Sequence, residues 1–281
     1  MHDDKGVLVA VDDARLNPLW QTASNLDVPV IIHVANPVAF FDALDHNSER
    51  WDELRAPPDW HFAAPLFPGF TAIIEAFARL VEKFPKLRFV GAHGGCYAEN
   101  LAWVEALLQR CPNFYVDISA RISELGRQPY SVRRFMEKFQ DRILFGIDCG
   151  PQLETYHTYY RFLETDDEYF NYSWDGGARQ GRWQIYGRDL PKPVLEKIYR
   201  RNASSLFGLG QILSDHVNLT DRLTYPAGAL PILGEEDYSI RHDLDHFTGF
   251  MGVGATAQQE VAELIAGHMA VPVARCANPD A

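Results

Sequence analysis

Three side chains that can bind a metal each end a short apolar segment of this chain. They are His33, His93 and Asp148, which close the segments 28–33, 88–93 and 142–148. The apolar residues run continuously instead of alternating with polar ones, which predicts strands buried on both faces, as in a parallel sheet. Residues at the carboxyl ends of such strands line the active sites of barrel enzymes. Two imidazoles and one carboxylate at that edge predict a site for a divalent metal.

The chemistry of such a site would depend on a metal and a proton carrier. A catalytic zinc keeps an open position for water and lowers the pKa of that water to about 7. Asp148 suits the transfer of the remaining proton, and His93 could polarise a substrate carbonyl. Each position also has a structural interpretation. His33 could bond a backbone group at a strand end, and Asp148 could cap a turn before Gly150.

Other polar and aromatic residues are candidates for binding a small-molecule substrate. Ser119 and Arg121 follow another apolar segment, 113–119. An arginine there could bind a substrate carboxylate through two hydrogen bonds, or form a surface ion pair. The paired Gly94 and Gly95 could admit a ligand close to the backbone or only make a turn. The aromatic residues between positions 51 and 67 could cover a substrate or fill the space under a loop.

From residue 14 to residue 207, helical and strand-like segments alternate. Helices are expected over residues 14–27, 70–84, 99–111, 132–139 and 193–207, and strands over the four apolar segments. Such alternation predicts parallel strands with helical crossovers. The connection over residues 35–69 is long enough to be a binding loop or lid. Residues 150–190 are expected to be irregular.

Composition excludes several classes of protein. The chain has 281 residues, 47% of them hydrophobic, and a formal net charge of −12, which argues against a nucleic-acid or anionic membrane surface. No apolar run reaches the roughly 18 residues of a spanning helix, and the first residues lack the apolar core of a signal peptide. Four scattered cysteines are typical of reduced thiols, so a cytoplasmic protein is expected.

Five segments, taken in order, resemble the amidohydrolase-related family, the branch of the amidohydrolase superfamily that includes aminocarboxymuconate-semialdehyde decarboxylase. The segments are 29–33, 86–95, 113–119, 143–148 and 202–209. The resemblance implies an α/β fold of the TIM (β/α)8-barrel type with a divalent metal, usually zinc, at the strand ends. It implies that His33 on strand five is a metal ligand and that His93 on strand six acts on substrate or on metal-bound water. It implies that Asp148 on strand eight binds metal and shuttles a proton.

The chain departs from this family at its start. The family's first strand carries a His-x-His pair, and none occurs among the 32 residues before His33. A full barrel takes about 250 residues. Residues 1–209 are therefore expected to form the C-terminal half of a barrel, strands five to eight, and residues 210–281 a mainly helical or irregular extension. An open sheet has unpaired edges, which favours association into a homo-oligomer.

The extension has a metal-site candidate of its own. His242 and His246 stand four residues apart with Asp243 between them, so on a helix both imidazoles would share one face. The segment resembles the His-Asp-x-x-His motif of a coenzyme-Q biosynthesis family, which implies metal or isoprenoid binding. An ordinary polar helix face is the alternative.

These observations predict a metal-dependent hydrolase in which His93 and Asp148 are catalytic and His33 and Asp148 hold the metal. Two alternatives remain. The first is a metal-dependent decarboxylase of an aromatic or unsaturated acid, because one scaffold supports several chemistries. The second is a non-catalytic remnant that needs a partner chain.

Overall fold

A parallel sheet of four strands forms the centre of the described part of the chain. A computed structural model describes residue 5 and residues 8–55, 60–150, 152–173 and 180–209. The predicted extension, including His242, Asp243 and His246, lies outside these residues. Among the residues described, no helix is long and apolar enough to cross a membrane.

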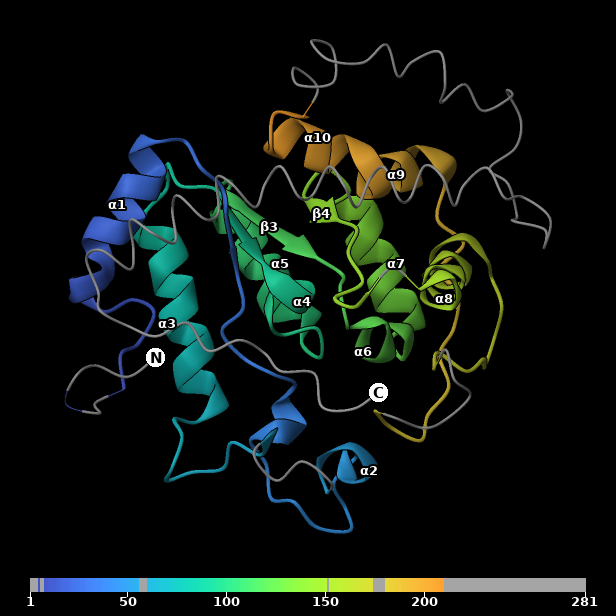
Figure 1. The fold of residues 1–281 in the computed structure, drawn as a ribbon. Coiled ribbons are helices and arrows are strands. Elements are labelled where there is room, and N and C mark those ends of the chain that lie inside the picture. Colours follow the sequence, from blue (N-terminus) through green and yellow to red (C-terminus); the bar gives the residue numbers. More distant parts are fainter. Residues whose placement is uncertain (1–4, 6–7, 56–59, 151, 174–179, 210–281) are drawn as a thin grey trace. The chain divides into compact units, whose positions relative to one another are not determined.

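The strands are β1 (Val30–Ile32), β2 (Phe89–Gly91), β3 (Phe114–Asp117) and β4 (Ile143–Leu144). They pair in the order β1-β2-β3-β4, and every pair is parallel (Figure 1). Strands that follow one another along the chain are therefore neighbours in the sheet, as in consecutive βα units of a barrel. The predicted α/β fold of the barrel type, with four parallel strands between residues 28 and 148, is confirmed.

A helix precedes each strand. α1 (Asn17–Asn25) comes before β1, and α3 (Phe70–Lys83), α5 (Leu101–Arg110) and α7 (Pro129–Lys138) connect the successive strands (Figure 1). Each has an apolar face produced by residues three or four positions apart. In α3, for example, Ile74, Phe77, Leu80 and Val81 are all buried. These helices agree with the predicted ones to within a few residues.

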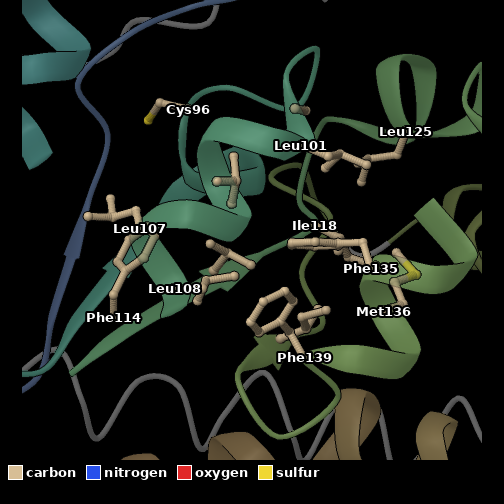
Figure 2. Close-up of a cluster of buried hydrophobic side chains, with 14 of the residues drawn as sticks. Cys96, Leu101, Leu107, Leu108, Phe114, Ile118, Leu125, Phe135, Met136 and Phe139 are labelled. Carbon is tan, nitrogen blue, oxygen red and sulfur yellow. The ribbon is translucent and has the colours of Figure 1, made fainter. Parts of the chain in front are cut away.

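The main hydrophobic core lies between these helices and one face of the sheet. Alternate strand residues such as Phe89, Phe114, Val116 and Ile143 point into it and are fully buried. Figure 2 shows side chains of β3, α5 and α7 meeting there, among them Leu107, Leu108, Phe135 and Met136. Burying one such side chain contributes about 1.5–3 kcal/mol, so this layer fixes the positions of the strands.

The opposite face of the sheet has a much smaller apolar cluster. Val90 of β2 and Leu144 of β4 are buried there against Leu206. Ile31 of β1 is paired in register with Val90 but remains 59% exposed. The prediction of strands buried on both faces is therefore confirmed for β2 and wrong for β1, whose Ile31 stays largely exposed.

The segments after β4 form helices that the sequence pattern predicted only in part. α8 (Leu153–Glu164) occupies a region predicted to be irregular. The predicted helix over 193–207 consists of α9 (Lys192–Glu196), a π-helical turn η4 (Lys197–Arg201) and α10 (Asn202–Leu206). η4 contacts β4, where the Phe145 amide donates to the Ile198 carbonyl at 3.0 Å. Gly208, with φ of 67°, follows α10 as the expected stop.

Short helical turns occupy the connections. Before β1 lies the 3₁₀ turn η1 (Ala14–Leu16), so the predicted helix over 14–27 begins as a tighter turn. The long connection over 35–69 contains η2 (Val38–Phe40) and α2 (Trp51–Leu54). α4 (Ala92–Gly95) and α6 (Ile122–Gly126) follow β2 and β3 directly, and they carry residues of the candidate site.

Candidate metal and catalytic site

His33, His93 and Asp148 converge at the carboxyl edge of the sheet. His33 directly follows β1, His93 lies two residues past β2 in α4, and Asp148 lies four residues past β4. His93 Nε2 is 3.1 Å from His33 Nδ1 and 3.7 Å from Asp148 Oδ2. The parallel sheet therefore brings together three residues that are up to 115 positions apart (148 − 33), with the buried His93 at the centre.

The backbone around His93 is left-handed. His93 itself has φ of 60°, followed by Gly94 at 68°, Gly95 at 72° and Cys96 at 59°. A non-glycine residue in this region costs of order 1–3 kcal/mol and is common at functional sites. The His93 amide donates to Asp117 Oδ1 at 2.9 Å, which helps to hold this turn. The paired glycines thus serve the turn that aims the His93 ring away from the helical core.

Hydrogen bonds assign the proton on the His93 ring. Nδ1 lies 2.8 Å from the Ser119 carbonyl oxygen, which can only accept. Nδ1 therefore carries the proton and donates it, so that in the neutral ring Nε2 has a free lone pair. That lone pair faces His33 and Asp148. With Nδ1 of His93 protonated, a hydrogen bond across the 3.1 Å between the two rings requires His33 Nδ1–H to donate to His93 Nε2.

Asp117 supports this arrangement, and sequence reasoning gave it no role. Its Oδ1 accepts from the His93 amide at 2.9 Å, from the Ser119 amide at 2.9 Å and from the Ser119 hydroxyl at 2.5 Å. The Ser119 hydroxyl oxygen is also 3.0 Å from His93 Nδ1. Asp117 Oδ1 thus holds the turn that carries His93. It also holds Ser119, whose carbonyl determines which ring nitrogen of His93 carries the proton. The available signal was an aspartate inside an apolar strand segment.

The His33 imidazole is neutral at pH 7. Burial of the ring, together with the nearby His93 and Arg121, lowers its pKa to about 4, while Asp148 acts in the opposite direction. A neutral imidazole is the form that binds a metal. The ring is also partly exposed to solvent, so a ligand can reach it.

Arg121, two residues after Ser119, is buried. Its side chain is only 6% exposed, and burial lowers the pKa of its guanidinium. Nη1 donates to the Ala120 carbonyl at 2.8 Å. The interpretation as a surface ion pair is wrong, because the side chain is buried and no residue in the described ranges forms an ion pair with it.

Buried charges fasten the long connection over 35–69 to the sheet. Arg50 is 1% exposed and forms ion pairs with Glu53, at 2.9 Å, and with Glu124 of α6. Its guanidinium also lies 5.3 Å from the centre of the Trp183 ring. Breaking a buried pair of this kind leaves an uncompensated charge and costs about 3–5 kcal/mol. Arg50 therefore anchors its part of the connection to α6, a role that the sequence did not reveal.

The aromatic residues of this connection divide into two groups. Phe62 packs against Phe40, Phe41 and Phe67, which supports the interpretation as filling. Trp60, by contrast, is 52% exposed. A cavity of about 700 Å³ lies between this connection and the turn after α4, lined by residues such as Val38, Asp42, Ser48 and Glu99. None of the three converging residues lines it.

The donor atoms at the carboxyl edge fit a divalent metal in type. Two imidazole nitrogens and a carboxylate oxygen suit zinc and related ions. His33 and Asp148, the two predicted ligands, both lie next to the His93 ring, at 3.1 and 3.7 Å from its Nε2. Over the described ranges, however, no three His, Cys, Asp or Glu residues form a ready-made metal cluster.

Comparisons with known proteins place this geometry in a family. The family model described as amidohydrolase matches residues 2–209. A search of functionally curated proteins gave no match.

Three solved structures are similar to the chain. An uncharacterised TIM-barrel protein from Bordetella bronchiseptica is 19% identical, with a TM-score of 0.44 over 72% of this chain and 53% of that one. 5-Carboxyvanillate decarboxylase from Sphingomonas paucimobilis is 14% identical, with a TM-score of 0.39 over 71% and 55%. A manganese-bound dihydroxybenzoic acid decarboxylase from Polaromonas sp. JS666 is 19% identical, with a TM-score of 0.39 over 72% and 56%.

The chain thus spans just over half the length of these three proteins. The match of the family model covers 208 residues (2 to 209), which is well over half of the 281. It also contains all four strands and all three converging residues. On this match, the chain belongs to the amidohydrolase family.

Proposed function

We propose that His33, His93 and Asp148 form a metal-dependent site that hydrolyses a small-molecule substrate. The observation that carries the proposal is the position of the His93 Nε2 lone pair, 3.1 Å from one candidate ligand and 3.7 Å from the other. His33 and Asp148 would hold the metal, for which zinc is our first choice. When bound, the metal would supply a Lewis acid that polarises a carbonyl and lowers the pKa of water.

The chain's own residues have separate tasks in this proposal. Asp148, whose side chain is 58% exposed, takes the proton of the attacking water and passes it to the leaving group. His93 accepts a hydrogen bond at Nε2 or, once protonated, donates one to the substrate oxygen. The Ser119 carbonyl and Asp117 keep the His93 ring in one tautomer and one orientation.

Decarboxylation is the second candidate. In that reaction the bond between a substrate carbon and its carboxylate breaks, carbon dioxide leaves, and a proton from Asp148 or His93 replaces it on the carbon. The same three residues could serve it. A buried cation two residues after Ser119, Arg121, supports a substrate that carries a carboxylate, which such a reaction requires.

Metal binding tests the proposal first. We expect purified protein to bind zinc or manganese at one ion per site, measured by elemental analysis and by competition with a coloured chelator. His33→Ala and Asp148→Ala should each weaken binding at least about tenfold, because each removes one of few ligands. His157→Ala is the matched control, since His157 is an exposed histidine on α8 and should change nothing.

Two results would contradict this assignment. If neither ligand variant changes metal affinity, the site at the carboxyl edge is not a metal site. If only His242→Ala abolishes binding, the metal belongs to the C-terminal extension. A chain that binds no metal, sediments as an assembly and lacks activity would support the alternative of a remnant that needs a partner.

Activity separates the reaction classes. A panel of esters, amides and lactones would report hydrolysis, and release of carbon dioxide from aromatic and unsaturated acids would report decarboxylation. His93→Gln should lower turnover at least about 100-fold with metal content unchanged, because it removes a proton-transfer group but no metal ligand. Unchanged turnover in this variant would exclude the proposed role of His93.

A further inference from the structure

Cys96 ends the turn that carries His93, and it combines a strained backbone with a buried side chain. Its φ is 59°, yet the residue is only 2% exposed and belongs to the main hydrophobic core (Figure 2). Glycine adopts a left-handed backbone without cost, whereas a residue with a Cβ atom is strained there. The Cys96 side chain must therefore make interactions that offset this strain.

The thiol of Cys96 bonds to both segments that carry the candidate histidines. Its sulfur accepts a hydrogen bond from the amide of Val34, the residue after His33, at 3.4 Å. It also donates to the carbonyl oxygen of Ala92, the residue before His93, at 3.4 Å. Burial raises the pKa of this thiol, so at pH 7 it keeps the proton that it donates.

This contact continues the connection between β1 and β2 beyond the end of the sheet. The paired register of the two strands ends at Ile32 and Gly91, so ladder hydrogen bonds do not hold the residues that follow. Both candidate histidines lie past this point. The hydrogen bond from Val34 to Cys96 joins the two segments there, where the two imidazole nitrogens approach to 3.1 Å.

We propose that Cys96 is a positioning residue of the candidate site. Its thiol holds the segment after His33 against the turn that carries His93, and so fixes the separation at which His33 Nδ1–H donates to His93 Nε2. The inference rests on the proposed function for its consequence, because a displaced His33 would bind a metal less tightly. The hydrogen bond between the two rings can, however, be observed without any metal.

Packing alone is the competing explanation. A free cysteine behaves as a small hydrophobic residue, and Cys96 could serve only to fill the core. The substitutions Cys96→Ser and Cys96→Ala separate the two explanations, because serine keeps a donor and an acceptor on Cβ and alanine keeps neither. If Cys96 positions His33, serine should preserve the arrangement of the rings. If it only packs, serine should have no advantage over alanine.

The test follows the tautomer of His33 in the full chain. Nitrogen NMR of histidine-labelled protein, in EDTA at pH 7.5 (about one unit above the ordinary pKa of histidine), distinguishes Nδ1–H from Nε2–H, and His33→Gln assigns the signals. In the parent chain we expect mainly the Nδ1–H form, because that proton is donated to His93. Cys96→Ala should lower the ratio of Nδ1–H to Nε2–H at least about tenfold, and Cys96→Ser less than about threefold.

Cys111→Ala is the matched control. Cys111 is also a buried thiol of the main core, at 4% exposed, but it lies between the end of α5 and the start of β3. Its substitution should lower stability to a similar degree, measured by urea denaturation, and leave the His33 tautomer unchanged. If Cys96→Ala does not fold by circular dichroism, Cys96→Gly takes its place, because glycine adopts the left-handed backbone without strain.

Several outcomes would overturn the inference. They are a parent chain with mainly Nε2–H at His33, an unchanged tautomer in Cys96→Ala, an equal loss in Cys96→Ser, and an equal loss in Cys111→Ala. Zinc affinity is measured separately, and Cys96→Ala should weaken it about tenfold. A parent chain with the expected tautomer but no bound zinc contradicts only the proposed function. A chain that binds zinc with a tautomer indifferent to Cys96 contradicts only the role of Cys96.

Discussion

The two ends of the sheet use polar side chains in opposite ways. At the amino ends, a polar residue precedes each of the last three strands: Arg88, Asn113 and Arg142. Their side chains donate to backbone carbonyls, for example Asn113 Nδ2 to those of Val81, Phe84 and Leu87 at 3.3, 3.1 and 2.8 Å. These hydrogen bonds link the ends of helices to the starts of strands, so these polar side chains stabilise the fold.

At the carboxyl ends, polar side chains bond to one another as well as to backbone groups. Asp117 and Ser119 hold His93, while His93, Ala120 and Asp148 all have positive φ. Strained backbone of this kind persists where the surrounding structure enforces it. At this edge of the sheet, lone pairs and hydrogen-bond donors remain available to a ligand. The comparison indicates that one end of the sheet supplies stability and the other keeps groups ready for a ligand, a division that is general among barrel enzymes.

Asn113→Ala should have the largest effect on stability. The variant leaves three backbone carbonyls at the amino end without their shared donor, in a position that is 8% exposed. We expect the free energy of unfolding to fall by about 3 kcal/mol, measured by urea denaturation. The metal affinity of the folded protein should not change. A large loss of ligand affinity would show that the two ends are not separable, and Asn25→Ala, at an exposed position, is the control.

Asp117→Ala should have a smaller effect on stability but a clear effect at the site. It removes the acceptor for two amides and one hydroxyl, for which we expect a loss of about 2 kcal/mol. Asp117→Asn keeps an acceptor oxygen at this position and should lose less than about 1 kcal/mol. Nitrogen NMR of the imidazoles should show a mixture of His93 tautomers only in the alanine variant. Equal behaviour of both variants would mean that Asp117 does not position His93.

The pH dependence of stability should show the smallest effect, and it reports on His33. The pKa of this imidazole is about 4 in the folded chain against 6.5 as its ordinary value. The unfolded chain therefore takes up the proton first, so the free energy of unfolding is highest above pH 6.5 and falls as the pH drops toward 4. Because the ring is partly exposed, solvent screening should limit the loss to about 1 kcal/mol or less.

His33→Gln provides the comparison for this pH effect. In EDTA, the difference between the parent chain and the variant should vary between pH 6.5 and 4 and stay constant above pH 7. An identical pH profile in both proteins would show that His33 is not held in its neutral form at the carboxyl edge.

The site could be located from the sequence because parallel strands have a simple geometry. Continuous apolar segments indicated β1, β2 and β4, and their carboxyl ends must lie along one edge. That reasoning brought His33, His93 and Asp148 to the same place. It could not separate residues in strands from residues just beyond them: His93 stands in a left-handed turn and Asp148 lies four residues past β4.

Other features depended on contacts that no local pattern encodes. The sequence pattern did not reveal the helix α8, because Tyr156 and Tyr160 lie between its buried positions Thr155, Tyr159 and Phe162. Without knowing which side faces the core, the aromatic residues have no visible period. The Arg50–Glu124 pair joins residues 74 positions apart (124 − 50), and neither residue has a neighbour in sequence that suggests its burial.

The sequence by itself determined that the strands are parallel and that three polar residues meet at one edge of the sheet, because these follow from hydrophobic period and from the rules of parallel connection. The family was indicated by the resemblance of five segments in order. Only the tertiary structure decided which ring nitrogen of His93 carries the proton, that Asp117 supports this arrangement and that the Arg121 side chain is buried. Those properties are set by distances of about 3 Å between residues far apart in the chain, and a pattern of residue types contains no such distances.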